Sequence, residues 1–490
     1  MRRLNFAAAA GAIALLAARS AAANGRFPQS NQIVFSPTDP NLVVARTTYG
    51  ILPSHDDGTS WRYLCDDVLG LPPNSVDDPE IGLTAGNALV AGVYDPHGPG
   101  LDVSTDLGCN WSCMGGALSG QDVHDVVVRP DAPHVVLALT STLGTRDGAL
   151  DNDSQVFQST DDGATWAPLG APIDPTVTVE TIDVAKSDPK RIYVSAWRGY
   201  GAYKTVSLFV STDAGAHWTE HPVAAYDNTT EDAIWIAAVD PTNADRVYLR
   251  TNAPRDGGRS RLFLSSDGGQ SFAVATSFDL GRAQSSAALT GEFLGFALSA
   301  DGSKVYAGSP DGGLFVANRA DMNFKHVSDI RVHCLATRGN ELWACSEQQN
   351  GFLIGVSTDD GKSFTTKLPS ILALCGPIVC DPEPGGPLGC GADANASACG
   401  ASYQTFCDTY AGQITPPCGT CPGADAGVED PGLAARPSGS SSCGCSAVGG
   451  RGSIAGLAGL AALAAVAGRR RRATRRHGDA RRGAPGGGKR

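Results

Sequence analysis

The sequence predicts an all-β protein, a seven-bladed β-propeller followed by a cysteine-rich segment and a short apolar helix near the C-terminus. Three observations lead to this fold class. An octapeptide recurs at the spacing of a propeller blade, and a turn followed by a short apolar run recurs seven times. The composition is typical of a turn-rich β protein, since the 490 residues include 60 Gly and 30 Pro and only 18% are charged.

The octapeptide reads Ser or Thr, any residue, Asp, any residue, Gly, any residue, a small or polar residue, and an aromatic residue. Six copies are present: SHDDGTSW at 54, STDLGCNW at 104, STDDGATW at 159, STDAGAHW at 211, SSDGGQSF at 265 and STDDGKSF at 357. Successive copies lie 50, 55, 52, 54 and 92 residues apart. Because the last interval is nearly twice the others, we expect a degenerate seventh copy near Ala317–Phe324, where only the terminal aromatic residue is kept.

A second repeat gives the same count. A turn and a short apolar run precede each copy, beginning at 36, 84, 129, 187, 240, 299 and 337. Each unit of roughly 40 to 55 residues contains four short β runs separated by Gly, Pro, Asp and Asn turns, as a propeller blade does. A β-helix would need a shorter repeat, and a helical solenoid would need helical periodicity. We therefore expect seven blades between about 27 and 370.

The N-terminus indicates export. Arg2 and Arg3 precede the apolar run Phe6–Ala18 and the small residues Ala21–Ala23, which is the order of a signal peptide cut after Ala23. In an oxidising compartment, the 14 cysteines imply disulfides. Between 24 and 468 the chain has 25 Lys and Arg against 49 Asp and Glu, a net charge of about −24 that disfavours nucleic acid and anionic lipid as partners.

The octapeptides resemble the Asp boxes of the bacterial-neuraminidase-repeat families, which include sialidase-like and photosystem II stability-factor-like propellers. The resemblance implies a hairpin turn between the third and fourth strands of a blade, away from the central pocket. In such a turn the Asp accepts hydrogen bonds from nearby amides, the Gly adopts a positive φ, and the aromatic residue packs between neighbouring blades. The implied structural residues are Asp56, Gly58, Trp61, Asp106, Gly108, Trp111, Asp161, Gly163, Trp166, Asp213, Gly215, Trp218, Asp267, Gly269, Phe272, Asp359, Gly361 and Phe364. A catalytic or calcium-binding role for the carboxylates is the competing interpretation.

The resemblance also raises glycoside hydrolysis as an alternative. A sialidase needs an arginine cluster, a Tyr nucleophile with a Glu, and an Asp acid, often with a Phe-Arg-Ile-Pro motif that the segment GRFP at 25–28 matches only superficially. Trp197, Arg198, Tyr200 and Tyr203 are candidates for a pocket, although such residues more often cover a surface. Xyloglucan-degrading propellers typically pair two units, and this chain has length for one. The catalytic residues, if any exist, stay unknown.

We expect no metal and no cofactor. The acidic clusters Asp77–Glu80 and Asp147–Asp153 lack the Asp-x-Asp-x-Asp-Gly spacing of a calcium loop. The nine histidines show no zinc-type spacing. Cys418 and Cys421 have a CxxC spacing, but in an exported cysteine-rich segment a disulfide explains them better than a metal.

The C-terminal region has a different composition. Seven cysteines lie between 375 and 421, where few apolar side chains are available for a core, and a Pro/Gly/Ser-rich spacer follows. Cys443 and Cys445 then precede an apolar run, Ile454–Gly468, and a cluster of arginines. Fifteen helical residues cover only about 22 Å, less than the ~30 Å hydrocarbon core of a bilayer.

This order of Cys, short apolar helix and Arg cluster resembles the MYXO-CTERM sorting signal of myxobacterial surface proteins. The resemblance implies a transient membrane anchor with its arginines in the cytoplasm, followed by cleavage by a C-terminal sorting protease near Cys443 or Cys445. A permanent C-terminal membrane anchor is the alternative.

The number of cysteines predicts a covalent link between propeller and tail. With Cys443 and Cys445 assigned to sorting, five cysteines remain in the propeller and seven in the segment 375–421. Both numbers are odd, so full pairing needs at least one bridge between the two parts. Cys334 and Cys345 lie on consecutive strands of one blade and can pair locally. Cys65, Cys109 or Cys113 is then the expected cross-linker, and spacing alone does not choose among them.

These observations divide the chain into a signal peptide (1–23), a propeller (24–372), a cysteine-rich disulfide segment (373–422), a flexible linker (423–442), a sorting signal (443–476) and a disordered tail (477–490). The favoured function is a non-catalytic recognition or scaffold module for a glycan, peptide or cell-envelope partner. It would be displayed on the surface or outer membrane of a myxobacterium-like Gram-negative bacterium, or released. A sialidase-like or other glycoside hydrolase is the alternative, and an assembly factor is a third hypothesis by analogy of fold.

Overall fold

A computed structural model of the chain describes residues 29–69, 71, 78–93, 100–114, 116–146, 149–252, 259–279, 289–290, 292–378 and 399–410. The chain divides into two compact units, 1–435 and 436–490, and all described residues belong to the first. The expected signal peptide, linker and sorting signal, with Cys443 and Cys445, lie outside the described residues. Among the helices of the described part, none is long and apolar enough to cross a membrane.

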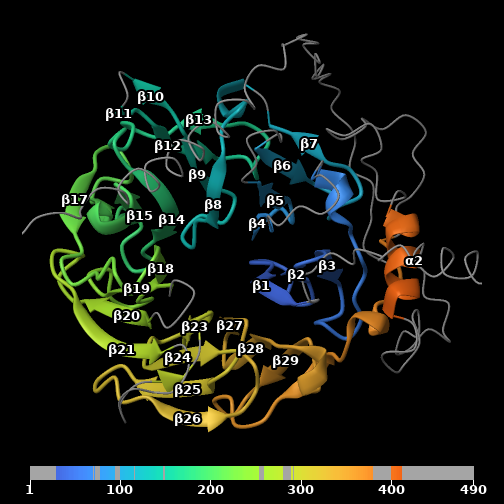
Figure 1. Cartoon of the computed structure of the whole chain (residues 1–490). Helices are drawn as coiled ribbons and strands as arrows, with labels where there is room; N and C mark the ends of the chain where they lie inside the picture. The colour runs from blue at the N-terminus through green and yellow to red at the C-terminus, as the bar shows by residue number, and fades with distance from the viewer. Residues whose placement is uncertain are drawn as a thin grey trace, which may run out of the picture. The chain divides into compact units, whose positions relative to one another are not determined.

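Seven mainly antiparallel sheets surround a common centre, which confirms the predicted seven-bladed propeller (Figure 1). Blade 1 contains β1 (Ser30–Phe35), β2 (Val43–Thr47) and β3 (Gly50–Ser54). Blade 2 contains β4 (Glu80–Leu83), β5 (Leu89–Gly92), β6 (Leu101–Ser104) and β7 (Ser112–Cys113). Blade 3 contains β8 (Val123–Val128), β9 (Val136–Thr142), β12 (Asp153–Ser159) and β13 (Ala167–Pro168), with the small hairpin of β10 (Thr145–Arg146) and β11 (Ala149–Leu150) between β9 and β12.

The other four blades follow the same order. Blade 4 contains β14 (Thr178–Val184), β15 (Ile192–Arg198), β16 (Thr205–Ser211) and β17 (Thr219–Pro222). Blade 5 contains β18 (Ile234–Val239), β19 (Val247–Thr251), β20 (Arg259–Ser265), β21 (Ala273–Asp279) and the short β22 (Leu289–Thr290). Blade 6 contains β23 (Gly295–Leu298), β24 (Lys304–Ser309), β25 (Gly313–Asn318) and β26 (Lys325–Ser328). Blade 7 contains β27 (Cys334–Arg338), β28 (Glu341–Cys345), β29 (Ile354–Ser357) and β30 (Thr365–Leu368).

The second strand of each blade is buried on both faces, which explains the apolar runs in the sequence. Strand β9, for example, is buried from Val136 to Ser141, and β28 is buried from Leu342 onward. A strand that is covered on both faces has no solvent side for polar residues, so alternation disappears. Blades then pack face to face, and each apolar cluster contains residues from two neighbouring blades.

Side chains close the ring between blade 7 and blade 1. Arg338 forms ion pairs with Asp57 of blade 1 and with Glu341, and Lys367 binds Asp57 at 2.9 Å. The Arg338 guanidinium also lies 5.0 Å from the ring centre of Phe35 and 5.1 Å from that of Trp343. These contacts, together with an apolar cluster that contains residues of both blades, help to hold the ring shut.

Blade 1 has three regular strands, and other segments of the chain cover its outer edge. The segment 62–64 takes the place of its fourth strand, through a bridge between Ile51 and Leu64. Residues that follow blade 7 pair with the outer side of this segment, since the amide of Tyr63 donates to Gly376 O at 2.9 Å and that of Ile378 donates to Tyr63 O at 2.9 Å. The last part of the propeller chain therefore covers the edge of its first blade.

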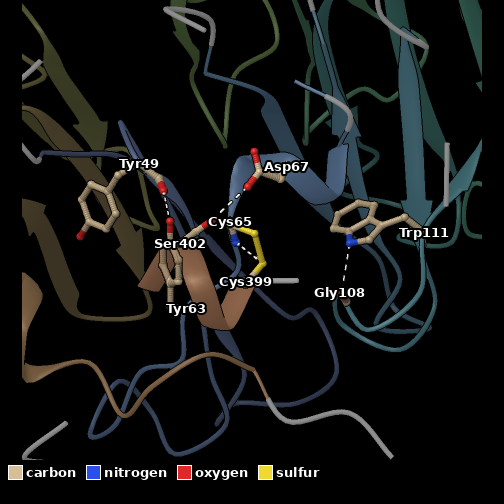
Figure 2. The surroundings of a disulfide bond; sticks show 8 residues. All are labelled: Tyr49, Tyr63, Cys65, Asp67, Gly108, Trp111, Cys399 and Ser402. Carbon is tan, nitrogen blue, oxygen red and sulfur yellow. Dashed lines mark hydrogen bonds between the residues drawn. A yellow bond between two sulfur atoms is a disulfide. The ribbon is translucent and has the colours of Figure 1, made fainter. Parts of the chain in front are cut away.

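A short helix, α2 (Cys399–Tyr410), is attached to the same edge, beside β3 in Figure 1. A disulfide joins Cys65 to Cys399, and Ser402 Oγ donates to Asp67 Oδ2 at 3.0 Å (Figure 2). Tyr403 of the same helix packs against Tyr63. The expected bridge between propeller and cysteine-rich segment is thus confirmed. The sequence did not predict α2; the apolar helix that it predicts, Ile454–Gly468, lies outside the described residues.

Other cysteines of the described part are also oxidised. Cys334 and Cys345, which were expected to pair, form a disulfide between β27 and β28, where they are direct partners. Cys109, Cys113, Cys375 and Cys407 are disulfide-bonded as well. Disulfides therefore hold both the propeller and the segment that follows it.

Candidate functional site

The six octapeptides form turns with the same hydrogen bonds. In the first, Ser54 Oγ donates to Asp56 Oδ1 at 2.9 Å, and the amides of Gly58 and Ser60 donate to Ser54 Oγ and Asp56 Oδ1 at 2.8 Å each. The serine bonds recur at 2.7–2.8 Å in the turns of Asp106, Asp161, Asp213, Asp267 and Asp359. The glycines Gly58, Gly108, Gly163, Gly215, Gly269 and Gly361 have φ from 74° to 109°, a region where a side chain would be strained.

The carboxylates of these turns are fully occupied by the turn itself. The seventh residue of each octapeptide donates a side-chain bond to the second carboxylate oxygen, as Ser363 Oγ does to Asp359 Oδ2 at 2.6 Å. Such bonds lower the pKa of Asp213, Asp267 and Asp359 to about 2. No cluster of acids, histidines or cysteines among the described residues has the arrangement of a metal site.

The aromatic residue of each octapeptide lies between two blades. Trp61 and Trp111 are 1% exposed, and their indole N–H groups donate to the carbonyls of Gly58 and Gly108 at 3.0 Å. Trp166 packs against a cluster that includes Val90 and Val103 of blade 2. Trp218, Phe272 and Phe364 pack in the same way against clusters shared with blades 3, 4 and 6.

Three turns contain a second acid that the sequence analysis did not interpret. Asp57, Asp162 and Asp360 follow the box Asp directly and have φ between 57° and 63°. Asp57 binds Arg338 and Lys367 of blade 7, Asp162 accepts from the amide of Gly86 in blade 2, and Asp360 accepts from Tyr306 in blade 6. Each therefore ties its blade to the preceding one, and the double Asp in the sequence is the signal for it.

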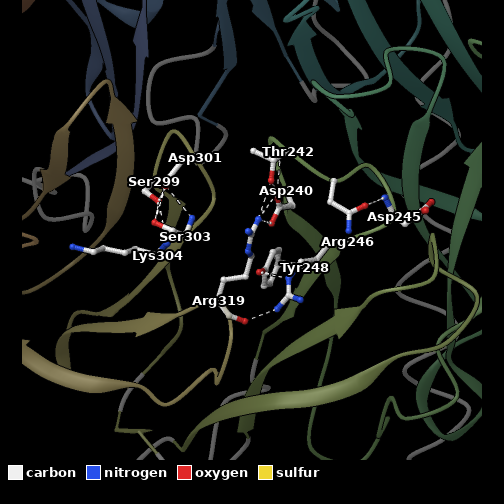
Figure 3. Close-up of polar contacts among 11 residues, drawn as sticks. Asp240, Thr242, Asp245, Arg246, Tyr248, Ser299, Asp301, Ser303, Lys304 and Arg319 are labelled. Atoms are coloured by element: carbon white, nitrogen blue, oxygen red, sulfur yellow. Dashed lines mark hydrogen bonds and ion pairs between the residues drawn. The ribbon is translucent and has the colours of Figure 1, made fainter.

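The degenerate seventh copy uses an arginine for this purpose. Arg319 stands where the other copies have their box Asp, and it pairs at 3.0 Å with the buried Asp240 of blade 5 (Figure 3). It also donates to Thr242 Oγ1 at 2.9 Å, while Arg246 donates to the Arg319 carbonyl at 3.0 Å. The lost turn is thus replaced by a direct link between blades.

The octapeptides and the central cavity lie at opposite ends of the propeller. Each octapeptide follows the third strand of its blade, at the end where the first, innermost strand also finishes, because neighbouring strands are antiparallel. A cavity of about 620 Å³ surrounds the axis near the other end, where innermost strands begin. Its volume is in the range of small-molecule or peptide-end sites.

Bulges in four innermost strands direct side chains into this cavity. Asn31, His124, Glu180 and Ala237 are the extra residues in β1, β8, β14 and β18, and all four line it. A bulge inserts one residue and re-aims a side chain, which is why bulges are frequent beside binding sites.

The residue after a bulge binds the next blade. Gln32, Asp125 and Thr181 are the residues that follow three of the bulges, and the side chain of each accepts a backbone amide from the innermost strand of the next blade. Ile81 N donates to Gln32 at 3.1 Å, Ile182 N donates to Asp125 at 2.8 Å, and Ile236 N donates to Thr181 at 2.8 Å. The bulges therefore combine cavity lining with contacts between blades.

Two acids of the cavity are held toward their neutral form. Burial raises the pKa of Glu180 to about 7, although Trp197 Nε1 donates to its Oε1 at 2.6 Å. Burial, together with the charge of Glu80, raises the pKa of Asp125 well above its usual value. Both Asp125 oxygens accept backbone amides, from Val126 and Ile182 at 2.8 Å each.

Two arginines face the same cavity, with different partners. Arg46 forms an ion pair with Glu80 at 2.7 Å. Arg250 lies against the ring of Trp235, with 4.8 Å to the ring centre, and donates to the Phe293 carbonyl at 3.3 Å. The cavity walls enclose its guanidinium and lower its pKa. Within the described part of the chain no carboxylate forms an ion pair with Arg250, although the charges of Glu292 and Glu80 act on it from farther away.

The model of one protein family matches more than half of this chain. The family is Sortilin-Vps10, with the description "Sortilin, neurotensin receptor 3", and the match covers residues 100–372, from β6 to beyond β30. The chain belongs to the Sortilin-Vps10 family. Among curated proteins, none matches it.

Similar solved structures include the GH74 xyloglucanase from Xanthomonas campestris, with 14% identity, 68% of this chain and 64% of that chain covered, and a TM-score of 0.32. The GH74 enzyme of Niastella koreensis is 14% identical, with 69% of this chain and 71% of that chain covered and a TM-score of 0.29. The structure "YCF48 bound to D1 peptide" is 12% identical, with 66% of this chain and 93% of that chain covered and a TM-score of 0.38. The chain spans less than two thirds of the Xanthomonas xyloglucanase.

The described residues that line the cavity of this Sortilin-Vps10 propeller do not include the sialidase set of side chains. Arg46 and Arg250 are the arginines among its described lining residues, and no tyrosine is among them. Of the four residues considered for a pocket, Trp197 lines the cavity, whereas Arg198 pairs with Glu220 at 2.7 Å. The other two, Tyr200 and Tyr203, are exposed on the loop that follows β15.

Proposed function

We propose that this Sortilin-Vps10 protein is an exported, non-catalytic binding protein that receives the anionic end of a ligand in its central cavity. The observation that carries the proposal is the enclosed guanidinium of Arg250, which forms no ion pair within the described part of the chain and is only partly balanced by the more distant charges of Glu292 and Glu80. An enclosed cation without an ion-pair partner is costly, and a bound carboxylate would remove that cost. The expected signal peptide and sorting tail support export and surface display.

A polypeptide end is the ligand that fits the charges. The body of the chain, with 25 basic and 49 acidic residues, repels polyanions such as acidic polysaccharides. A peptide with a free C-terminus offers one carboxylate to Arg250 without bringing further negative charge. The volume of about 620 Å³ accommodates the last few residues of such a chain.

The acids of the cavity support binding rather than hydrolysis, because each is engaged within the protein. Glu80 pairs with Arg46, and Asp125 accepts two amides. Glu180 accepts from Trp197 Nε1, but its carboxyl group, with a pKa raised to about 7, can serve as a general acid and so favours a second candidate, a glycoside hydrolase.

Binding of short synthetic peptides to the purified protein tests the proposal. An array of peptides of varied sequence is presented with free and with amidated C-termini. We expect peptides with free ends to bind and amidation to abolish binding. Arg250→Gln should weaken binding roughly 30-fold or more. Lys362→Gln, which removes an exposed charge in the octapeptide turn of blade 7, should leave binding unchanged. Equal binding of free and amidated peptides would contradict the proposal.

The hydrolase is tested with fluorogenic sialosides and with neutral polysaccharides. If the wild-type protein turns over one of these substrates and Glu180→Gln does not, the protein is an enzyme and the proposed binding function is wrong. Absence of turnover on these substrates is the result expected from the engaged acids.

A further inference from the structure

The loop beside the cavity exposes two tyrosines. Four large hydrophobic side chains of the described part are exposed, and two of them, Tyr200 at 63% and Tyr203 at 86%, lie in the loop 199–204 between β15 and β16. The loop begins two residues after Trp197, which lines the cavity. Exposed aromatic side chains that cluster next to a cavity indicate a contact surface, whereas single ones need no explanation.

The loop holds these rings in a fixed arrangement. Gly199 and Gly201 have φ of 75° and 56°, and a Cβ on Gly199 would lie 2.5 Å from the Tyr203 carbonyl oxygen. The amide of Tyr203 donates to Tyr200 O at 3.1 Å, which closes a short 3-10 turn. Tyr200 packs edge-on against Trp197, with ring centres 5.5 Å apart. The exposure of the tyrosines is therefore built into the backbone.

At the end of this loop, the ammonium group of Lys204 lies between an aromatic ring and a carboxylate. Lys204 Nζ lies 4.5 Å from the ring centre of Trp197 and 3.1 Å from Asp232 Oδ1. Asp232 is 67% exposed, so its carboxylate also reaches outward, beside the loop that carries the tyrosines. The exposed ring faces of Tyr200 and Tyr203 are surfaces that lysine and arginine side chains can contact through cation–π interactions, and Asp232, although paired with Lys204, adds a carboxylate to the neighbouring surface.

We infer that Tyr200, Tyr203 and Asp232 form a specificity subsite for a basic side chain of the ligand. The inference rests on the proposed function, because the ligand reaches this rim from the cavity. A peptide with its carboxylate at Arg250 and a lysine or arginine a few residues earlier meets both sites. The acidic surface of the propeller favours the same ligand.

The test compares peptides that differ in one residue. In a peptide that binds the protein, each position near the C-terminus is replaced in turn by lysine, arginine, glutamate or norleucine, which keeps the aliphatic stem without the charge. We expect lysine or arginine at one position to improve affinity roughly tenfold over norleucine. The double variant Tyr200→Ala/Tyr203→Ala should reduce this ratio to about one while the norleucine peptide binds as before.

Two further variants make the result specific. Tyr200→Phe/Tyr203→Phe retains the rings and should keep the preference for a basic residue, since the ring face and not the hydroxyl contacts the cation. Val274→Ala trims another exposed apolar residue, in blade 5, and should change nothing. A wild-type protein without a preference for basic residues, or a preference that survives in the alanine pair, overturns the inference. If Arg250→Gln abolishes binding while the wild type shows no preference for basic residues, or while the alanine pair keeps that preference, this subsite is refuted and the proposed function stays intact. Unchanged binding in Arg250→Gln refutes the proposed function.

Discussion

Removal of the disulfide between Cys65 and Cys399 should destabilise the propeller more than removal of the one between Cys334 and Cys345. A disulfide restricts the unfolded chain, and its effect grows with the length of the loop that it closes. The two bonds span 334 and 11 residues. The chain-entropy relation then gives about 6 kcal/mol for the long loop and about 3 kcal/mol for the short one.

The value for the long loop is an upper limit, because the disulfides of Cys109, Cys113, Cys375 and Cys407 already restrict the unfolded chain. The assay is guanidinium unfolding without reductant, for the two double Cys→Ala variants and the wild type. Tyr403→Phe is a control for the docked helix, since it removes the hydroxyl group that donates to the Leu374 carbonyl and should cost about 1 kcal/mol. Equal losses for the two disulfide variants would refute the reasoning from loop length.

Three other changes test the propeller. Trp111→Ala should cost about 3 to 5 kcal/mol and Trp166→Ala less, because Trp111 is 1% exposed and Trp166 is only half-buried; equal melting temperatures for the two variants would argue against this account. Asp57→Asn removes the charge that Arg338 and Lys367 share, and we expect a loss of about 1 to 2 kcal/mol in urea titrations, which should shrink in high salt. Burial raises the pKa of Asp102 to about 8, so the folded state keeps a proton that the unfolded state has lost above about pH 4. Stability should therefore fall by as much as about 1.4 kcal/mol per unit as pH rises from 5 to 8, and Asp102→Asn should show a flatter profile in thermal melts; identical profiles would exclude Asp102 as the cause.

The blades were predictable because their signals are local. Each octapeptide closes its own turn with its own serine, aspartate and glycine, so its meaning does not depend on the remainder of the chain. The degenerate copy shows the limit of that logic. Arg319 replaces a turn by a bond to Asp240, a residue 79 positions earlier, and no local pattern announces the pairing.

The candidate site was not predictable in the same way. Glu180 and His124 reach the cavity because of bulges, which depend on the pairing of two strands. One feature of the sequence could have indicated that Arg250 lies at a site. Arg250 ends an apolar run of β19 just before Thr251, as Arg46 does before Thr47 in β2, and a charge at the end of a strand buried on both faces needs a reason. The parity of the cysteines, by contrast, was enough to predict a bridge to the tail.

The way in which blade 1 is completed also sets an order of events during synthesis. Its outer edge is covered only by residues 375–378, which leave the ribosome after all seven blades. Until then the segment 62–64 is an open strand edge, which is a template for pairing with another chain. Blades 2 to 7 have their strands in consecutive order and can form as they emerge, whereas the first blade to appear is the last to be finished. A chain that stops short of residue 375 would therefore leave this edge bare, and truncation there should produce aggregation rather than a smaller stable ring.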